Sequence, residues 1–481
     1  MITVVMLLEI AFLCLAGWGF FYTDNTRLAD ALALGIGLTL VSLSVSFQLA
    51  FLLGLPALSF LFEAIMLLVA LFILRSRWRR LLLAWQRFRR FVATYWLTSL
   101  ILGVCGSYLL LLVLLLPVSE IDTLVYNHTR VLLFQEQNTM LLSHVTKEHQ
   151  AVFPVGSDIL AHMFLRFYTD YGTALFGFLS YLVIVFGSYA LARRYASPRL
   201  ALCATLIVIS MPKLVYQASS TKNDIVSAAA GLLCLLLLYR LSERPSGRDL
   251  LLLALMMSFG ISTKTTFLAF LLPFVVLTGF ILIRKHGWDT WWRILTSSWR
   301  GVVFITIPVL VLSQVWLFVH NMLVWGGWTG SPELVQAHQH NDGIGGAIAN
   351  LLRYFFQTPD LLWLTDAASR YLTGQKLSGV IQWLYDTTIA PLVGDAGLGR
   401  YPFEIVWSAN EASGGFGPMA FFVALPALGY AFLRGPLLLR SLVLIQIIYI
   451  FLWHGRSSGC HGTIVFLLFS LHLPHLVLPM R

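Results

Sequence analysis

The stretch ILGVCGSYLLLLVLLLPVSEIDTLVYNHTR, residues 101–130, contains the transition that decides the fold. Residues 101–117 are almost wholly apolar, whereas the last eleven positions carry five ionisable side chains: Glu120, Asp122, Tyr126, His128 and Arg130. A helix needs about 20 apolar residues to cross the hydrocarbon core of a membrane. The stretch therefore predicts a membrane-spanning helix over residues 92–117 with a dense cluster of ionisable groups at its mouth.

The composition of the whole chain agrees with a membrane protein. Of 481 residues, 58% are hydrophobic and only 11% are charged, and the mean hydropathy is +0.80, which excludes an ordinary soluble domain. The net charge of +10 does not indicate nucleic-acid binding, because Lys and Arg occur in short clusters between apolar runs. The five cysteines are scattered without paired spacing, so we expect neither a disulfide framework nor a cysteine-based zinc site.

Thirteen apolar stretches qualify as membrane spans. Only a helix satisfies its own backbone hydrogen bonds inside the bilayer, so the predicted fold class is an all-α polytopic membrane protein. Three of the stretches are short, which gives 11–13 transmembrane helices. The stretches are 3–22, 29–53, 55–75, 92–117, 174–192, 200–218, 224–241, 250–263, 265–283, 301–325, 418–433, 441–453 and 462–480.

The orientation follows from the basic segment RSRWRRLLLAWQRFRR, residues 75–90, whose seven arginines predict a cytoplasmic location. Alternation of the remaining segments then places 21 of the 32 Lys and Arg residues on the cytoplasmic side. Two long loops, 118–173 and 326–417, emerge on the outer face, and we expect amphipathic helices in both. In GIGGAIANLLRYFF, residues 343–356, the apolar side chains recur at helical spacing.

The acidic cluster after residue 117 has the chemistry of a catalytic site. Asp122, Tyr126 and Arg130 recur every four residues, so on a helix they share one face. Glu120 and His128 add two more titratable groups. A carboxylate here could simply mark the water boundary, but the density of groups favours a general base that accepts a proton from a hydroxyl.

Three further polar clusters lie on the predicted outer side, the first of them at the start of an amphipathic segment and the other two at ends of spans. Asp158, in FPVGSDIL, is either a helix N-cap or a site residue. Lys222 and Asp224, in SSTKNDIV, lie at the entrance of span 224–241. Asp224 or Asn223 would be a natural cap there; alternatively, the unpaired backbone N–H groups beside Lys222 suit a phosphate. Lys264, in GISTKTT, lies between two apolar spans, which makes it a functional candidate unless it only reaches to the interface. Its expected partner is an anionic headgroup or one of these carboxylates.

The late outer loops carry weaker signals. Glu411, in NEASGGFGP, is part of a turn or lines a substrate site, and Arg456, in WHGRSSGCHG, could hold a phosphate. The sequence HQHND, residues 338–342, has metal-ligand types at alternating positions but lies in a loop, so we do not expect a metal site.

A family resemblance emerges from these residues. The pattern D-x-x-x-Y-(H/N)-x-x-R, here Asp122, Tyr126, Asn127 and Arg130, resembles the first outer loop of C-type (GT-C) glycosyltransferases, which include protein O-mannosyltransferases and lipid A aminoarabinose transferases. The blocks FPVGSDIL, SSTKNDIV, GISTKTT and NEASGGFGP look like the corresponding blocks of bacterial members. The resemblance covers roughly residues 92–330, and residues 1–91 precede the apparent family core as an addition or a divergent beginning.

The resemblance implies a GT-C fold. Its parts would be N-terminal transmembrane helices with a basic cytoplasmic loop (1–91), a catalytic transmembrane core (92–325), the large outer loop (326–417) and C-terminal transmembrane helices (418–481). It also implies one inverting step, in which a sugar moves from a polyprenyl-phosphate donor to a hydroxyl or amine of a lipid, glycan or protein acceptor. The active site would face the periplasm from a bacterial inner membrane.

The resemblance assigns roles to the candidate residues. Asp122 would be the base, Glu120 or Asp158 would orient it or bind substrate, and Lys222, Lys264 and Arg456 would bind the phosphate. Some related families need a divalent metal, which we do not favour here, and no other cofactor is expected. The competing class is a transporter or lipid flippase, but no internal repeat is evident and the polar residues crowd one face.

Overall fold

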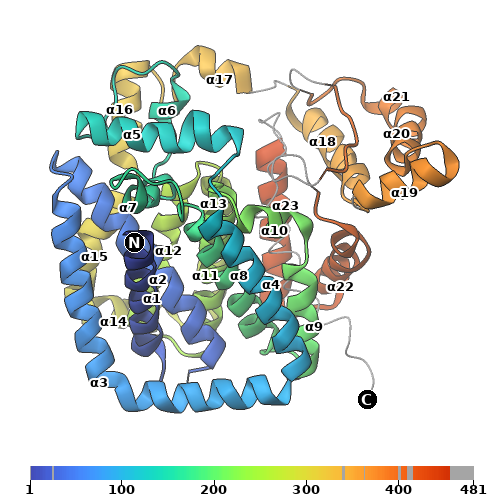
Figure 1. Ribbon diagram of the computed structural model, residues 1–481. Helices are drawn as coiled ribbons and strands as arrows, with labels where there is room; N and C mark the ends of the chain where they lie inside the picture. Colours follow the sequence, from blue (N-terminus) through green and yellow to red (C-terminus); the bar gives the residue numbers. More distant parts are fainter. Residues whose placement is uncertain are drawn as a thin grey trace. The chain divides into compact units, whose positions relative to one another are not determined.

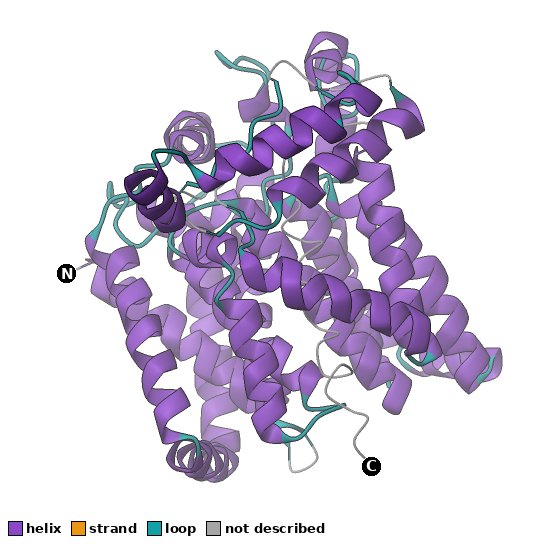
Figure 2. Cartoon of the chain, turned by 90° about the vertical axis from the view of Figure 1, so that its right-hand side faces the viewer, coloured by secondary structure: helices purple, strands orange, loops and turns teal. Residues whose placement is uncertain are grey.

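The computed structural model describes residues 2–23, 26–338, 342–361, 363–398, 402–408 and 415–454. Within these ranges the chain consists of helices joined by loops, and Figures 1 and 2 show no strand there. Eight helices are long and apolar enough to cross a membrane, which confirms an all-α polytopic membrane protein. They are α1 (Ile2–Phe21), α2 (Leu28–Leu52), α3 (Leu58–Thr94), α4 (Trp96–Leu115), α8 (Leu175–Ala192), α11 (Asn223–Glu243), α13 (Phe267–His286), and α15 (Trp299–Leu312) continued by α16 (Val315–Trp325).

The three short predicted spans correspond to helices that are shorter or less uniformly apolar than the eight spans above. Span 462–480 lies outside the described residues. Span 250–263 corresponds to α12, span 418–433 to η3 and α22, and span 441–453 to α23. Their bounds are α12 (Gly247–Thr263), η3 (Ala420–Ala424), α22 (Leu425–Arg434) and α23 (Leu437–His454).

The predicted span over 200–218 is bent in the structure. The segment forms two helices, α9 (Pro198–Ile209) and α10 (Pro212–Ala218), which meet at an angle of 72°. Pro212 lacks the N–H that would continue the helical hydrogen bonding, and a proline disfavours helical geometry at the residue before it. The apolar character of the stretch could not show this break.

The chain divides into two compact units, and the first contains Met1–Ala190, Gln217–Thr265 and Asp289–Thr329. Its helix α1 packs on α2 at a glycine crossing, since a Cβ atom at Gly17 would lie 2.5 Å from the carbonyl oxygen of Gly35. Helix α11 is almost fully buried and packs on α12. The unit also holds the shorter elements η1 (Thr123–Asn127), α5 (His128–Gln137), α6 (His149–Val152), η2 (Asp158–Ala161), α7 (His162–Leu165) and α14 (Trp288–Ser297).

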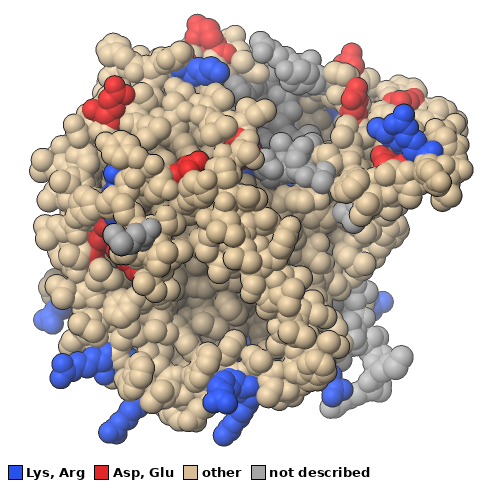
Figure 3. Space-filling model, viewed as in Figure 1, with Lys and Arg blue, Asp and Glu red and all other residues tan. Residues whose placement is uncertain are grey.

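Helices α3 and α4 enclose one side of the first unit. Figure 1 shows α3 running down the side and then turning beneath it, and Figure 3 shows Lys and Arg side chains along the same lower edge. Helix α3 carries the exposed Arg75, Arg79, Arg87 and Arg90. Helix α4 returns with little of its surface buried. An open hollow of about 690 Å³ runs along one face of it, lined from Val92 to Leu111 (Figure 3).

The second unit contains Leu191–Tyr216, Thr266–Trp288 and Gly330–Arg481. In it α13 packs on α23, and α23 contacts α18. Helix α18 confirms the amphipathic helix predicted over residues 343–356. Its buried Arg353 donates hydrogen bonds to the carbonyl oxygens of Gly394 (2.7 Å) and Ala396 (2.5 Å), which ties the helix to the turn that follows α21. The outer-loop helices are α17 (Pro332–His338), α18 (Gly343–Gln357), α19 (Trp363–Thr373), α20 (Leu377–Thr388) and α21 (Ala390–Val393).

Candidate functional site

The first outer loop meets the turn before α11, and Lys222 is the centre of that contact. Its ammonium group forms ion pairs with the carboxylates of both Glu120 and Asp122. The backbone is tied at the same place, because the Thr123 Oγ1 and Thr221 Oγ1 atoms lie 2.5 Å apart and the Asn127 side chain donates to the carbonyl oxygen of Thr221 (3.3 Å). Two segments about a hundred positions apart thus form one site.

The two carboxylates that share Lys222 differ in exposure. The side chain of Glu120 is only 7% exposed and accepts a hydrogen bond from Thr123 Oγ1 (2.9 Å), whereas the side chain of Asp122 is 58% exposed. Burial raises the pKa of Glu120, and the nearby Lys222 ammonium opposes that rise. For Lys222, burial alone would lower the pKa, but the two carboxylates reverse this and raise it, so the lysine stays charged. Asp122 is therefore the member that a substrate can reach.

The local backbone is unusual where these side chains arise. Asp122 immediately precedes η1, a π-helical turn, and α5 follows directly. Such turns are rare and often occur at functional sites. Asp122, Tyr126 and Arg130 lie in one helical stretch, whose turn at Thr123–Asn127 is π-helical. Asp122 pairs with Lys222, and Tyr126 accepts a hydrogen bond from Arg130.

Arg130 organises a second, fully buried cluster. It forms an ion pair with Asp158 (Nη1 to Oδ2, 3.0 Å), and neither side chain has exposed surface. It also donates to the Tyr126 hydroxyl (3.0 Å) and to the carbonyl oxygens of Phe153 (2.5 Å) and Pro154 (3.2 Å). Asp158 opens η2, so this pair holds η2 against α5 within the loop 118–173.

Burial sets the protonation of this cluster. It raises the pKa of the Asp158 carboxyl to about 6, against the opposing charge of Arg130, and it raises the pKa of the Tyr126 phenol. In the neighbouring His128, burial lowers the pKa to about 4. The tyrosine and the histidine are therefore neutral at pH 7.

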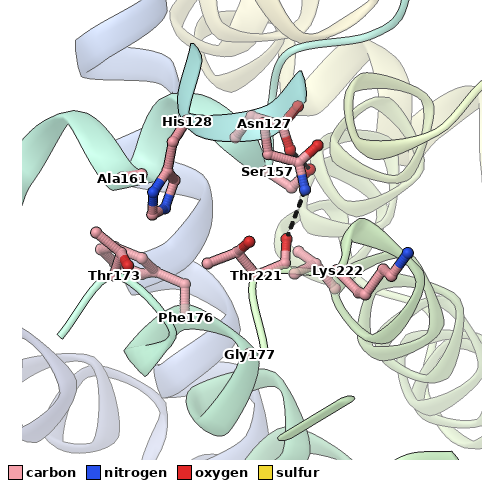
Figure 4. A pocket seen from close by; sticks show the side chains of 11 residues that line it. Asn127, His128, Ser157, Ala161, Thr173, Phe176, Gly177, Thr221 and Lys222 are labelled. Atoms are coloured by element: carbon pink, nitrogen blue, oxygen red, sulfur yellow. Dashed lines mark hydrogen bonds between the residues drawn. The ribbon is translucent and has the colours of Figure 1, made fainter. Parts of the chain in front are cut away.

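A small cavity lies between the two clusters. Its volume is about 10 Å³, room for about one water molecule. Figure 4 shows the side chains of His128 and Asn127 directed towards Thr173 and Thr221 across it. The cavity is far too small for a sugar, so an approaching substrate would meet the exposed side of Asp122 instead.

Lys264 belongs to a third ion pair. It is the C-cap residue of α12, and its ammonium group pairs with Asp224 in the first turn of α11. The side chain of Asp224 is 4% exposed. The partner of Lys264 is thus one of the predicted carboxylates. The prediction that Asp224 or Asn223 caps α11 is wrong, because Lys222 occupies the N-cap position and the Asp224 carboxylate is engaged by Lys264.

Two predicted site residues, Glu411 and Arg456, lie outside the described residues, as does His340 of the HQHND sequence. Two contributors were not predicted: Thr221, which lies in a run of polar residues, and Gln314, an amide inside an apolar span. Polar residues inside apolar spans are uncommon and often functional, so that rarity was the available signal for Gln314.

The comparison with known proteins agrees with this geometry. Residues 159–317 match the model of the family described as dolichyl-phosphate-mannose-protein mannosyltransferase. The matched range includes Lys222, Asp224 and Lys264 and begins one residue after Asp158. No match was found among curated proteins or among solved structures. The family match confirms the resemblance to GT-C enzymes and supports a membrane glycosyltransferase that uses a lipid-linked sugar donor.

Proposed function

We propose that this protein transfers a sugar from a polyprenyl-phosphate donor to an acceptor hydroxyl or amine at the outer face of the membrane, with Asp122 as the general base. The observation that carries the proposal is the ion-paired trio of Glu120, Asp122 and Lys222, in which one carboxylate is exposed and the other two charges are nearly buried. This places a proton acceptor beside a permanent cation.

The chemistry balances with these residues alone. The acceptor oxygen or nitrogen attacks the anomeric carbon, its proton passes to the Asp122 carboxylate, and the bond from that carbon to the phosphate oxygen breaks. The electron pair remains on the phosphate, whose developing charge Lys222 stabilises. Glu120 holds Lys222 from the other side, so the lysine keeps a partner when it turns from Asp122 to the phosphate.

The isoprenoid chain of the donor would lie along α4. The hollow on this helix is lined by Trp96, Tyr108 and Leu111 among other residues, and α4 ends a few residues before Glu120. A lipid tail in this hollow would bring its phosphate towards the trio. Lys264 and Arg456 remain predicted phosphate ligands, and Tyr126, His128, Asp224 and Glu411 predicted substrate-binding residues.

Arg130 and Asp158 have no exposed side-chain surface in this arrangement, so we propose that they shape the loop around the site. We also propose a reaction without a metal ion or other cofactor. Among the described residues no three His, Cys, Asp or Glu side chains are grouped to hold a metal, and the carboxylates at the site are already paired with cations.

The location of the reaction is part of the proposal. Arginines line one edge of the first unit, which suits the cytoplasmic side, and the trio follows the opposite end of α4. The site would then face the periplasm from a bacterial inner membrane. The acceptor would be a lipid, a glycan or a protein.

Native mass spectrometry of the gently purified protein tests the proposal. We expect wild type to retain a polyprenyl phosphate or its glycosylated form, Lys222→Met to lose it, and Asp122→Asn to keep the intact sugar donor. Lys147→Met and Glu136→Gln, exposed residues of the same outer loop, are the matched controls. If no isoprenoid binds to any variant, the proposal fails and a transporter becomes the better explanation.

A further inference from the structure

Three buried side chains form a closed chain of hydrogen bonds with the loop that carries Asp158. The Val155 N–H donates to Gln314 Oε1 (3.3 Å), Gln314 Nε2 donates to Gln48 Oε1 (2.7 Å), and Gln48 Nε2 donates to Ser44 Oγ (2.9 Å). Ser44 Oγ then donates to the carbonyl oxygen of Gly156 (2.7 Å). The chain of hydrogen bonds thus begins at the Val155 N–H and ends at the carbonyl oxygen of Gly156, the next residue of the loop.

Burial makes this circuit specific. Ser44, Gln48 and Gln314 have no exposed surface, and all of them lie within or between apolar helices. A buried amide that loses its partner costs free energy, and bonds that run in one direction around a circuit strengthen one another. These polar groups therefore have one arrangement in which all of them are satisfied.

The backbone at Gln314 supports a positioning role. The residue lies at the break between α15 and α16 with φ 58° and ψ 14°, a left-handed conformation that is unfavourable for a side chain other than glycine. Its amide also donates to the carbonyl oxygen of Val311 (3.1 Å), as expected where a helix is interrupted. The interrupted helix explains the bond to Val311, but it does not require the two further hydrogen bonds that Gln314 makes with Gln48 and Val155.

The loop is fitted closely on its other sides. The Gly156 N–H donates to the carbonyl oxygen of Ser262 (2.6 Å), and a Cβ atom at Gly156 would lie 2.1 Å from Ser262 Oγ. Arg130 binds the carbonyl oxygens of Phe153 and Pro154. The loop thus lies between the circuit on one side and Arg130 on the other.

We propose that Ser44, Gln48 and Gln314 are positioning residues that hold loop 153–158, and through it the Arg130–Asp158 pair, in the geometry of the site. Two of the three belong to α2, in the N-terminal region that precedes the family core. Helix α2 therefore helps to position the site. Only the consequence for donor binding rests on the proposed function.

The test measures loop accessibility without any substrate. Val155→Cys is introduced after the five native cysteines are replaced, and its reaction rate with a membrane-impermeant maleimide is measured in wild type, Gln314→Leu, Gln48→Leu and the double variant. Val155 is fully buried, so the starting rate is low. Ser46→Ala is the matched control, because Ser46 lies on the same helix and donates to Met66 Sδ (3.7 Å), away from the loop.

We expect the rate to rise about fivefold or more in both single variants and in the double variant, the order that loss of one buried hydrogen bond predicts. Thermal stability should follow a different pattern. In the double variant both amides are replaced, so neither remains buried opposite a missing partner. The double variant should therefore recover part of the stability that the single variants lose.

Labelling that recovers together with stability in the double variant would show a merely structural role and overturn the proposal, as would unchanged labelling in the single variants. If Gln314→Leu fails to fold, Gln314→Gly replaces it, since glycine accepts the left-handed backbone. If wild type binds no polyprenyl phosphate but the labelling pattern holds, the proposed function fails and the positioning inference stands.

Discussion

Replacing Asp158 by alanine should destabilise the protein by about 3–5 kcal/mol, because it leaves Arg130 buried without its counter-ion. Both side chains are 0% exposed and their charged atoms are 3.0 Å apart, so water cannot replace the lost partner without opening the loop. Arg130 keeps its bonds to Tyr126, Phe153 and Pro154, which places the expected value at the lower end of that range.

A double replacement separates the cost of the orphaned charge from the worth of the pair. In Arg130→Met with Asp158→Leu no charge remains buried, so most of the loss should disappear. The Phe153 and Pro154 carbonyl groups and the Tyr126 hydroxyl then lose their donor, which leaves a residual cost of about 1–3 kcal/mol. The double variant should therefore be more stable than Asp158→Ala alone.

Reversible unfolding in mixed detergent micelles measures these differences, with the exposed Glu136→Ala as the control that should stay within about 0.5 kcal/mol of wild type. A cost below about 1 kcal/mol for Asp158→Ala would refute the reasoning, because an orphaned buried charge cannot be that cheap. So would a double variant that is as unstable as the sum of the two single variants.

Three further outcomes follow from the same geometry. Asp122→Asn should leave the free energy of unfolding within about 0.5 kcal/mol of wild type, because the Asp122 side chain is 58% exposed. The rate of sugar transfer should fall by about 10²–10⁴-fold. A loss of activity that is matched by an equal loss of stability would contradict a base role. Burial lowers the folded-state pKa of His128 to about 4 and of His162 to about 3, whereas unfolded histidine titrates near 6.5. At these two histidines protons therefore bind the unfolded chain first, so their contribution to stability should fall as the pH drops from 6.5 towards 4. In a melting series His162→Gln should lose less stability than wild type over that window. Lys264→Met should destabilise the protein, because the buried Asp224 carboxylate loses its paired cation, and adding Asp224→Asn should restore part of the stability in the same unfolding assay.

The exposed Asp122 and the buried Asp158 show how one loop divides its tasks. The first can change partners when a substrate arrives, because solvent already reaches it. The second cannot exchange partners without breaking a buried ion pair. On the proposed function, the chemical and the structural role thus belong to different carboxylates of the same loop.

Local composition is enough to predict the fold class and the segments that carry the candidate site residues. Membrane-spanning helices follow from local hydropathy, since about 20 apolar residues suffice to define a span, and a run of arginines predicts the cytoplasmic side. Ionisable groups are rare in such a chain, so Glu120, Asp122, Lys222 and Lys264 stand out from their apolar surroundings by residue type alone.

Only the tertiary structure decided which of these groups meet. The pairs of Lys222 with Asp122 and of Arg130 with Asp158 join distant segments, and no periodicity encodes such contacts. The left-handed backbone at Gln314 likewise depends on what surrounds it. A charge buried in a membrane protein is tolerated only beside its partner, and that partner is chosen by packing between helices, which the order of residues along the chain does not display.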